Sequence, residues 1–270
     1  MVLCPFVLLF ALPFAAPVAP PVAAPLANAV LLAPPALSPQ GQEAEVTASY
    51  RKLAEDMDEA GLAKVWREHP DLVLTTLDED LEGALALVEK SDKPDEKAIA
   101  EMHARALFGA HAALVAGLSP ILADYAASYV GFDAAQQKQF RAGQKAFGKA
   151  RAAAKAGQQD DALAAGNECV ADAEPLGDWW GTAMGFSAAG QALLALNRND
   201  EALVAFARAR ALHHDLGLVG SEYGNLQGMV AALQALKQTS RLQEIARQAA
   251  ALGHALGDED GAAKLEKLAG

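Results

Sequence analysis

Hydrophobic residues recur at helical intervals along most of the chain. Between residues 71 and 90, a stripe of apolar side chains advances by three or four positions at each step, which places its members on one face of a helix. The stripe consists of Leu74, Leu77, Leu81, Leu85 and Val88. After residue 42, no stretch alternates apolar and polar residues as a half-buried strand would. The pattern predicts an all-α protein.

Residues that stop or cap helices divide this pattern. They lie at positions 70–71, 91–94, 117–120 and 131–133, where Gly, Ser, Asp and Pro gather. Such residues end one helix, cap the next and supply a proline for its first turn. They predict about four helices in an N-terminal helical region at residues 43–130.

A longer pattern repeats in the second half of the chain. Leu-Gly pairs end at Gly177, Gly217 and Gly257, and Gly157, Asn197 and Lys237 mark a second series with the same spacing. Glycine and asparagine suit the left-handed residue just past a helix end, so each unit is expected to be two helices joined by a short turn. The units span residues 133–176, 178–216 and 218–256, and a capping helix follows at 258–270. Stacking such units buries a continuous core.

The middle unit has small residues where two helices would cross and an aromatic residue beside them. The positions are Phe186, Gly190 and Leu193 in its first helix and Ala202, Phe206 and Ala209 in its second. This arrangement resembles the tetratricopeptide repeat family, in a variant with a longer repeat than usual. The flanking units depart from the family pattern at Gly166 and Val230. Over residues 133–257, the resemblance implies a right-handed α-solenoid of antiparallel helix pairs.

The resemblance also implies a binding surface. Proteins of this family hold peptides on a concave face lined by the first helix of each repeat. The corresponding residues here are Gln144, Phe147, Arg151, Lys155, Met184, Ser187, Gln191, Gln227 and Gln234. One subgroup grips a C-terminal carboxylate with Lys, Asn and Arg at such positions, but Phe147, Ser187 and Gln191 depart from that pattern, so this clamp is not predicted. The expected guest is a protein or peptide segment of some acidic character. Alternatively, each of these residues is an ordinary solvated helix residue.

Trp179 and Trp180 stand at the start of a predicted helix. Adjacent helical side chains point about 100° apart, so at least one indole is expected to pack against the preceding repeat. A second, exposed indole could anchor a partner.

Charge and motifs narrow the class of function. The formal net charge of −12 disfavours a nucleic-acid partner, because an acidic surface repels phosphate. The sequence lacks G-x-S-x-G, H-E-x-x-H, Cys-x-x-Cys and phosphate-loop motifs, so neither an enzyme nor a cofactor is predicted. The alternative is an enzyme or small-ligand binder with its site in residues 43–130 and the repeats as an accessory.

Histidines, cysteines and a run of acids are weak candidates for chemistry. His103 and His111 are separated by two helical turns, too far to share one metal ion. His213 is expected to border the core, whereas His214 points away. The acidic residues 78–82 are interpreted as a solvated helix face, and Cys169 as a small buried hydrophobe. No metal site is predicted.

The segment 1–42 differs from the rest of the chain. It contains no Asp, Glu, Lys or Arg and nine of the thirteen prolines. A bilayer span needs about 20 mostly apolar residues, and prolines interrupt such runs here, so no stable transmembrane helix is predicted. We interpret residues 1–29 as a signal peptide and residues 30–42 as an Ala/Pro-rich linker, which predicts export to the periplasm or cell exterior. The missing basic residue before the apolar run leaves open a misassigned start or an uncleaved tether.

Overall fold

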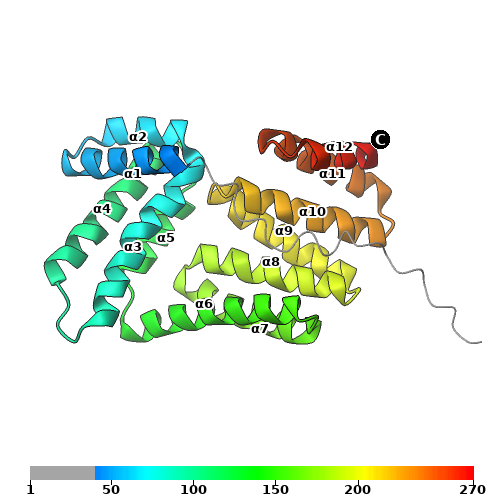
Figure 1. Ribbon diagram of the computed structural model, residues 1–270, viewed down its shortest axis with the longest axis horizontal. Coiled ribbons are helices and arrows are strands. Elements are labelled where there is room, and N and C mark those ends of the chain that lie inside the picture. The colour runs from blue at the N-terminus through cyan, green and yellow to red at the C-terminus, as the bar shows by residue number, and fades with distance from the viewer. Residues whose placement is uncertain (1–39) are drawn as a thin grey trace, which may run out of the picture.

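A computed structural model describes residues 40–270 of the chain (Figure 1). Within this range the regular structure consists of α-helices and short 3-10 turns, and no strand is present. The prediction of an all-α protein is therefore confirmed for the described part of the chain. The predicted signal peptide and nearly all of the predicted linker lie outside the described residues.

The first five α-helices form an N-terminal bundle, where the sequence predicted about four. Its elements are α1 (Gln40–Glu55), α2 (Glu59–Glu68), η1 (Pro70–Leu72), α3 (Val73–Lys90), α4 (Glu96–Val115) and α5 (Ile121–Val130). The four leucines of the apolar stripe in α3 are buried in the core of this bundle, whereas Val88 is half-buried. Trp66 is fully buried there, and its indole N–H donates to the carbonyl oxygen of Gly109 at 2.9 Å.

The remaining helices form a helical array in which each helix packs on the next one along the chain. Its elements are α6 (Ala134–Lys155), α7 (Gln159–Ala173), η2 (Glu174–Leu176), α8 (Trp179–Ala195), α9 (Asn199–Asp215), α10 (Val219–Ala235), α11 (Thr239–Ala255) and α12 (Glu259–Ala269). In Figure 1 the array rises from α6 and α7 at the bottom to α11 and α12 at the top, with the N-terminal bundle at its left.

The turns of the array recur at equal intervals along the chain with one backbone conformation. Left-handed φ angles between 57° and 76° occur at the predicted turn positions, Gly157, Gly177, Asn197, Gly217, Lys237 and Gly257. Each of these residues lies between two helices, as the repeat pattern predicted. Met57, between α1 and α2, adopts the same conformation with φ of 54°. Its turn was not marked in the sequence, because methionine rarely takes this backbone geometry.

The predicted crossing of small and aromatic residues organises the core of the array. Phe206 is fully buried, and a Cβ atom built on Gly190 or Gly228 would lie within 3.0 Å of its ring. At Gly166, where the family has an aromatic residue, a Cβ atom would lie 2.9 Å from the backbone nitrogen of Ala189. Helices α7 and α8 therefore approach each other too closely for a large side chain at position 166.

Candidate functional site

The first helices of the three units contact one another. Helix α6 packs on α8, and α8 packs on α10, whereas contacts among the second helices α7, α9 and α11 are sparser. The nine residues predicted to line the binding surface are all exposed or half-buried. We call these nine residues the first-helix face.

Several side chains of the first-helix face are held by neighbours. The guanidinium of Arg151 lies 5.8 Å from the ring centroid of Phe147. The hydroxyl of Ser187 donates to the side-chain oxygen of Asn225 at 2.8 Å, which ties α8 to α10. Among residues 40–270, neither Arg151 nor Lys155 forms an ion pair, so both charges are available on an otherwise acidic chain.

Trp179 and Trp180 lie where the array meets the N-terminal bundle. Both are half-buried and pack against the bundle's core, which extends to Leu176, Leu216 and Leu218 of the array. The indole N–H of Trp179 donates to the carboxylate of Asp124 in α5 at 2.6 Å. Both indoles thus take part in joining the array to the bundle.

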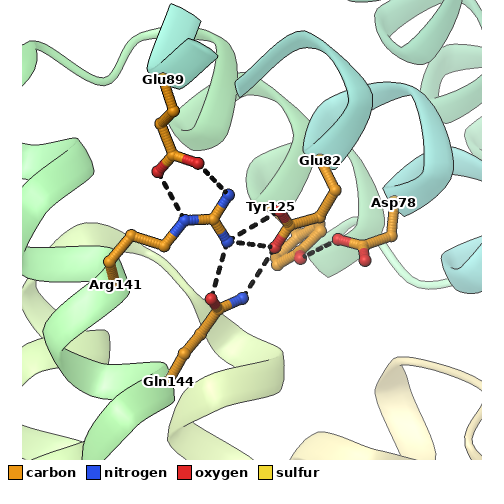
Figure 2. Close-up of polar contacts among 6 residues, drawn as sticks. All are labelled: Asp78, Glu82, Glu89, Tyr125, Arg141 and Gln144. Atoms are coloured by element: carbon orange, nitrogen blue, oxygen red, sulfur yellow. Dashed lines mark hydrogen bonds and ion pairs between the residues drawn. The ribbon is translucent and has the colours of Figure 1, made fainter. Parts of the chain in front are cut away.

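Polar contacts complete this junction (Figure 2). Arg141 of α6 donates from Nε to Glu89 at 2.7 Å and from Nη1 to Glu82 at 3.0 Å, so one guanidinium holds two carboxylates of α3. Gln144 donates to the same Glu82 at 2.7 Å. Gln144 was predicted to line the binding surface, and the structure places it against the N-terminal bundle.

Two further carboxyl groups are enclosed at the junction. Asp78 of α3 accepts from the hydroxyl of Tyr125 at 2.6 Å, and Asp178 caps α8 by accepting from the backbone N–H of Gly181 at 2.8 Å. Burial raises the pKa of Asp78 to about 7, with added repulsion from Glu82 and Asp178. Burial likewise raises the pKa of Asp178 to about 6, with added repulsion from Glu82. We call Asp78, Glu82, Glu89, Tyr125, Arg141, Gln144 and Asp178 the junction cluster.

The interpretation of residues 78–82 as a solvated face was wrong. Asp80 is only 4% exposed, where it accepts from the hydroxyl of Tyr50 at 2.7 Å and from Nε of Arg105 at 2.8 Å. Asp78 and Glu82 are half-buried, and of the acids in this run only Glu79 is exposed. The apolar stripe reveals one covered face of α3, but partners from the rest of the bundle and from α6 cover its polar sides as well.

The structure places His213, His214 and Cys169 as the sequence predicted. His213 is buried and His214 is exposed, as predicted. Cys169 is 1% exposed, and burial raises the pKa of its thiol to about 12, which agrees with a structural role. Within the described chain, no three His, Cys, Asp or Glu side chains are arranged to hold a metal ion.

A cavity of about 20 Å³ lies between α3, α4, α5 and the first turn of α6. Its lining is largely apolar, with His103 and Gln137 as polar members. Small-molecule sites usually enclose roughly 300–1,000 Å³, whereas this space suits a single water molecule. The alternative of a small-ligand site in residues 43–130 gains no support from this cavity.

Between residues 40 and 270, every helix is too short or too polar to cross a bilayer. Comparison with known proteins gave no matching family model and no matching curated protein.

Proposed function

We propose that this chain is an exported scaffold of the α-solenoid type, which binds a segment of a partner protein along the first-helix face. The observation that carries the proposal is the contact of α6 with α8 and of α8 with α10. When one helix of each pair contacts its counterparts more closely than the other does, the stack curves toward that side. The first-helix face would then be the inner wall of a right-handed solenoid, as in the tetratricopeptide family.

The chemistry of this wall supports a protein guest. Its amide and hydroxyl groups, such as Gln227, Gln234 and Ser187, can pair with the backbone of a bound chain. A guest chain can approach the backbone of the first helices α6 and α10 closely, because a Cβ atom on Gly148 or Gly224 would meet nothing within 4 Å.

The positive charges of the wall suit an acidic guest. Helix α6 carries six Lys or Arg residues and no acid, in a chain whose net charge is −12. Arg141 is engaged by α3, and Lys149 by Glu168 at 3.2 Å. Of the other four, Arg151 and Lys155 belong to the first-helix face and can attract carboxylates of a partner. The proposal includes no catalytic step and no cofactor.

Site-specific photo-crosslinking in the producing cells tests this proposal. A photoreactive amino acid is placed at Gln234, on the first-helix face, or at Val204, which is 55% exposed on the second helix α9. Adducts with a partner protein are expected from position 234 and should weaken when Arg151 and Lys155 are both changed to Glu. Equal adducts from position 204, or adducts insensitive to the charge reversal, would contradict the proposal.

A further inference from the structure

The junction cluster contains more carboxylates than one cation can balance. Asp78, Glu82 and Asp178 influence one another's charge across the junction, and Glu82 shares the single guanidinium of Arg141 with Glu89. Asp78 and Glu82 belong to α3 of the N-terminal bundle. Asp178 and Arg141 belong to the array. Excess negative charge therefore accumulates where the two parts of the molecule meet.

Apart from Arg141 of α6, the groups that face these carboxyl groups from the packed elements carry no positive charge. Helix α5 contributes the hydroxyls of Tyr125 and Tyr129, and burial raises the pKa of both. Helix α7 contributes the thiol of Cys169, whose pKa is raised to about 12. All three groups are neutral near pH 7. Arg141 is thus the only cation among the residues that face Asp78 or Asp178 in the described structure.

The same carboxyl groups lie inside a close contact between the array and the bundle. A Cβ atom on Gly177, next to Asp178, would lie 2.5 Å from the side-chain oxygen of Ser128 in α5. Trp179 and Trp180 pack beside them on the bundle core. Asp78 and Asp178 can be hydrated fully only if α3 and α5 move away from the start of α8.

We propose that the junction between the N-terminal bundle and the array is a pH-responsive contact, which loosens when Asp78 and Asp178 lose their protons. The direction follows from linkage. In the closed junction the pKa of Asp78 is about 7 and that of Asp178 is about 6, both above the ordinary value of 3.8. Their contribution to closure is complete below about pH 4. It is lost as the pH rises through about 6 and 7, because the closed state then confines two carboxylates that repel Glu82.

Acrylamide quenching of tryptophan fluorescence in the full chain tests the proposal. Trp66 is fully buried in the bundle, so changes in quenching report on Trp179 and Trp180. In the wild type, the Stern–Volmer constant is expected to increase between about pH 5 and about pH 8. In Asp78→Asn, which keeps an oxygen for the Tyr125 hydroxyl, the increase should be much smaller.

Two further variants make the result decisive. Asp178→Asn retains the capping of α8, since asparagine is also a good N-cap, and should likewise reduce the increase if the first variant folds poorly. Glu79→Gln alters the next residue of α3, which is exposed and paired with Arg51 at 3.4 Å, and should behave as the wild type. A flat wild-type profile, or an undiminished increase in both Asn variants, would overturn the proposal.

Discussion

Gly217 of the array rests against Pro70 of the N-terminal bundle. A Cβ atom at position 217 would lie 2.8 Å from the carbonyl oxygen of Pro70, and the glycine has a left-handed φ of 74°. Two requirements therefore coincide at this turn: a backbone conformation that favours glycine and a contact that leaves no space for a side chain.

We expect Gly217→Ala to destabilise the protein more than Gly157→Ala. Both glycines have left-handed φ angles, 74° and 76°, so each substitution costs about 1–2 kcal/mol for the backbone conformation. Only position 217 has a neighbour within reach, because a Cβ atom at Gly157 would meet nothing within 4 Å. The added overlap should cost about 1–3 kcal/mol more, as measured by urea denaturation. Equal losses of unfolding free energy in the two variants would show that the backbone at Pro70 moves aside at no energetic cost.

Gly228 and Phe206 are expected to be energetically coupled. Gly228→Ala places a methyl group 2.6 Å from the tip of the Phe206 ring, which should cost about 1–3 kcal/mol of unfolding free energy. In a Phe206→Leu background this cost should shrink, and a double-mutant cycle measures the difference.

Gly224→Ala is the control for this cycle, since the site lies on the same helix and is open. There, alanine should stabilise the helix by up to about 1 kcal/mol. Additive effects of the changes at positions 206 and 228 would contradict the packing of Phe206 between Gly190 and Gly228.

His213 should make the protein less stable in acid. Asn225 donates to its Nδ1 at 2.8 Å, while Nε2 is buried without a partner, and burial lowers the pKa of His213 to about 4. Because the folded pKa lies below the unfolded value of about 6.5, the stabilising contribution is present above about pH 6.5 and is lost as the pH falls toward 4. By about pH 5 the loss should reach about 2 kcal/mol.

His213→Asn keeps an acceptor for Asn225 and does not titrate. Comparing the urea unfolding free energies of this variant and the wild type at about pH 8 and about pH 5 isolates the effect of the imidazole from the opposite trend of Asp78. A constant difference between the two proteins at both pH values would mean that His213 is not held neutral in the folded state.

The turns of the array could be predicted from sequence, whereas the junction could not. Gly177, Asn197 and Gly217 belong to residue types that favour a left-handed backbone, and equal spacing within each series repeats the signal. The contact of Arg141 with Glu82 joins residues 59 positions apart, and no local pattern encodes it. The run from Asp78 to Glu82 resembles a solvated face because its acids lie between and beside Leu77 and Leu81, two leucines of a single apolar stripe. The dense acids of α3 beside the basic helix α6 were the available signal, but their pairing depends on how the bundle docks.

The bundle packs on the turns at both ends of the second unit, since its core includes Leu176 before Gly177 and both Leu216 and Leu218 around Gly217. These turns mark the boundaries of the second unit. Removing that unit would therefore remove part of the surface on which the bundle packs. The third unit contributes only its first residue, Leu218, to this core. Gain or loss of a helix pair after Leu218 would leave this core intact, so variation in the length of the array should be confined to its C-terminal end.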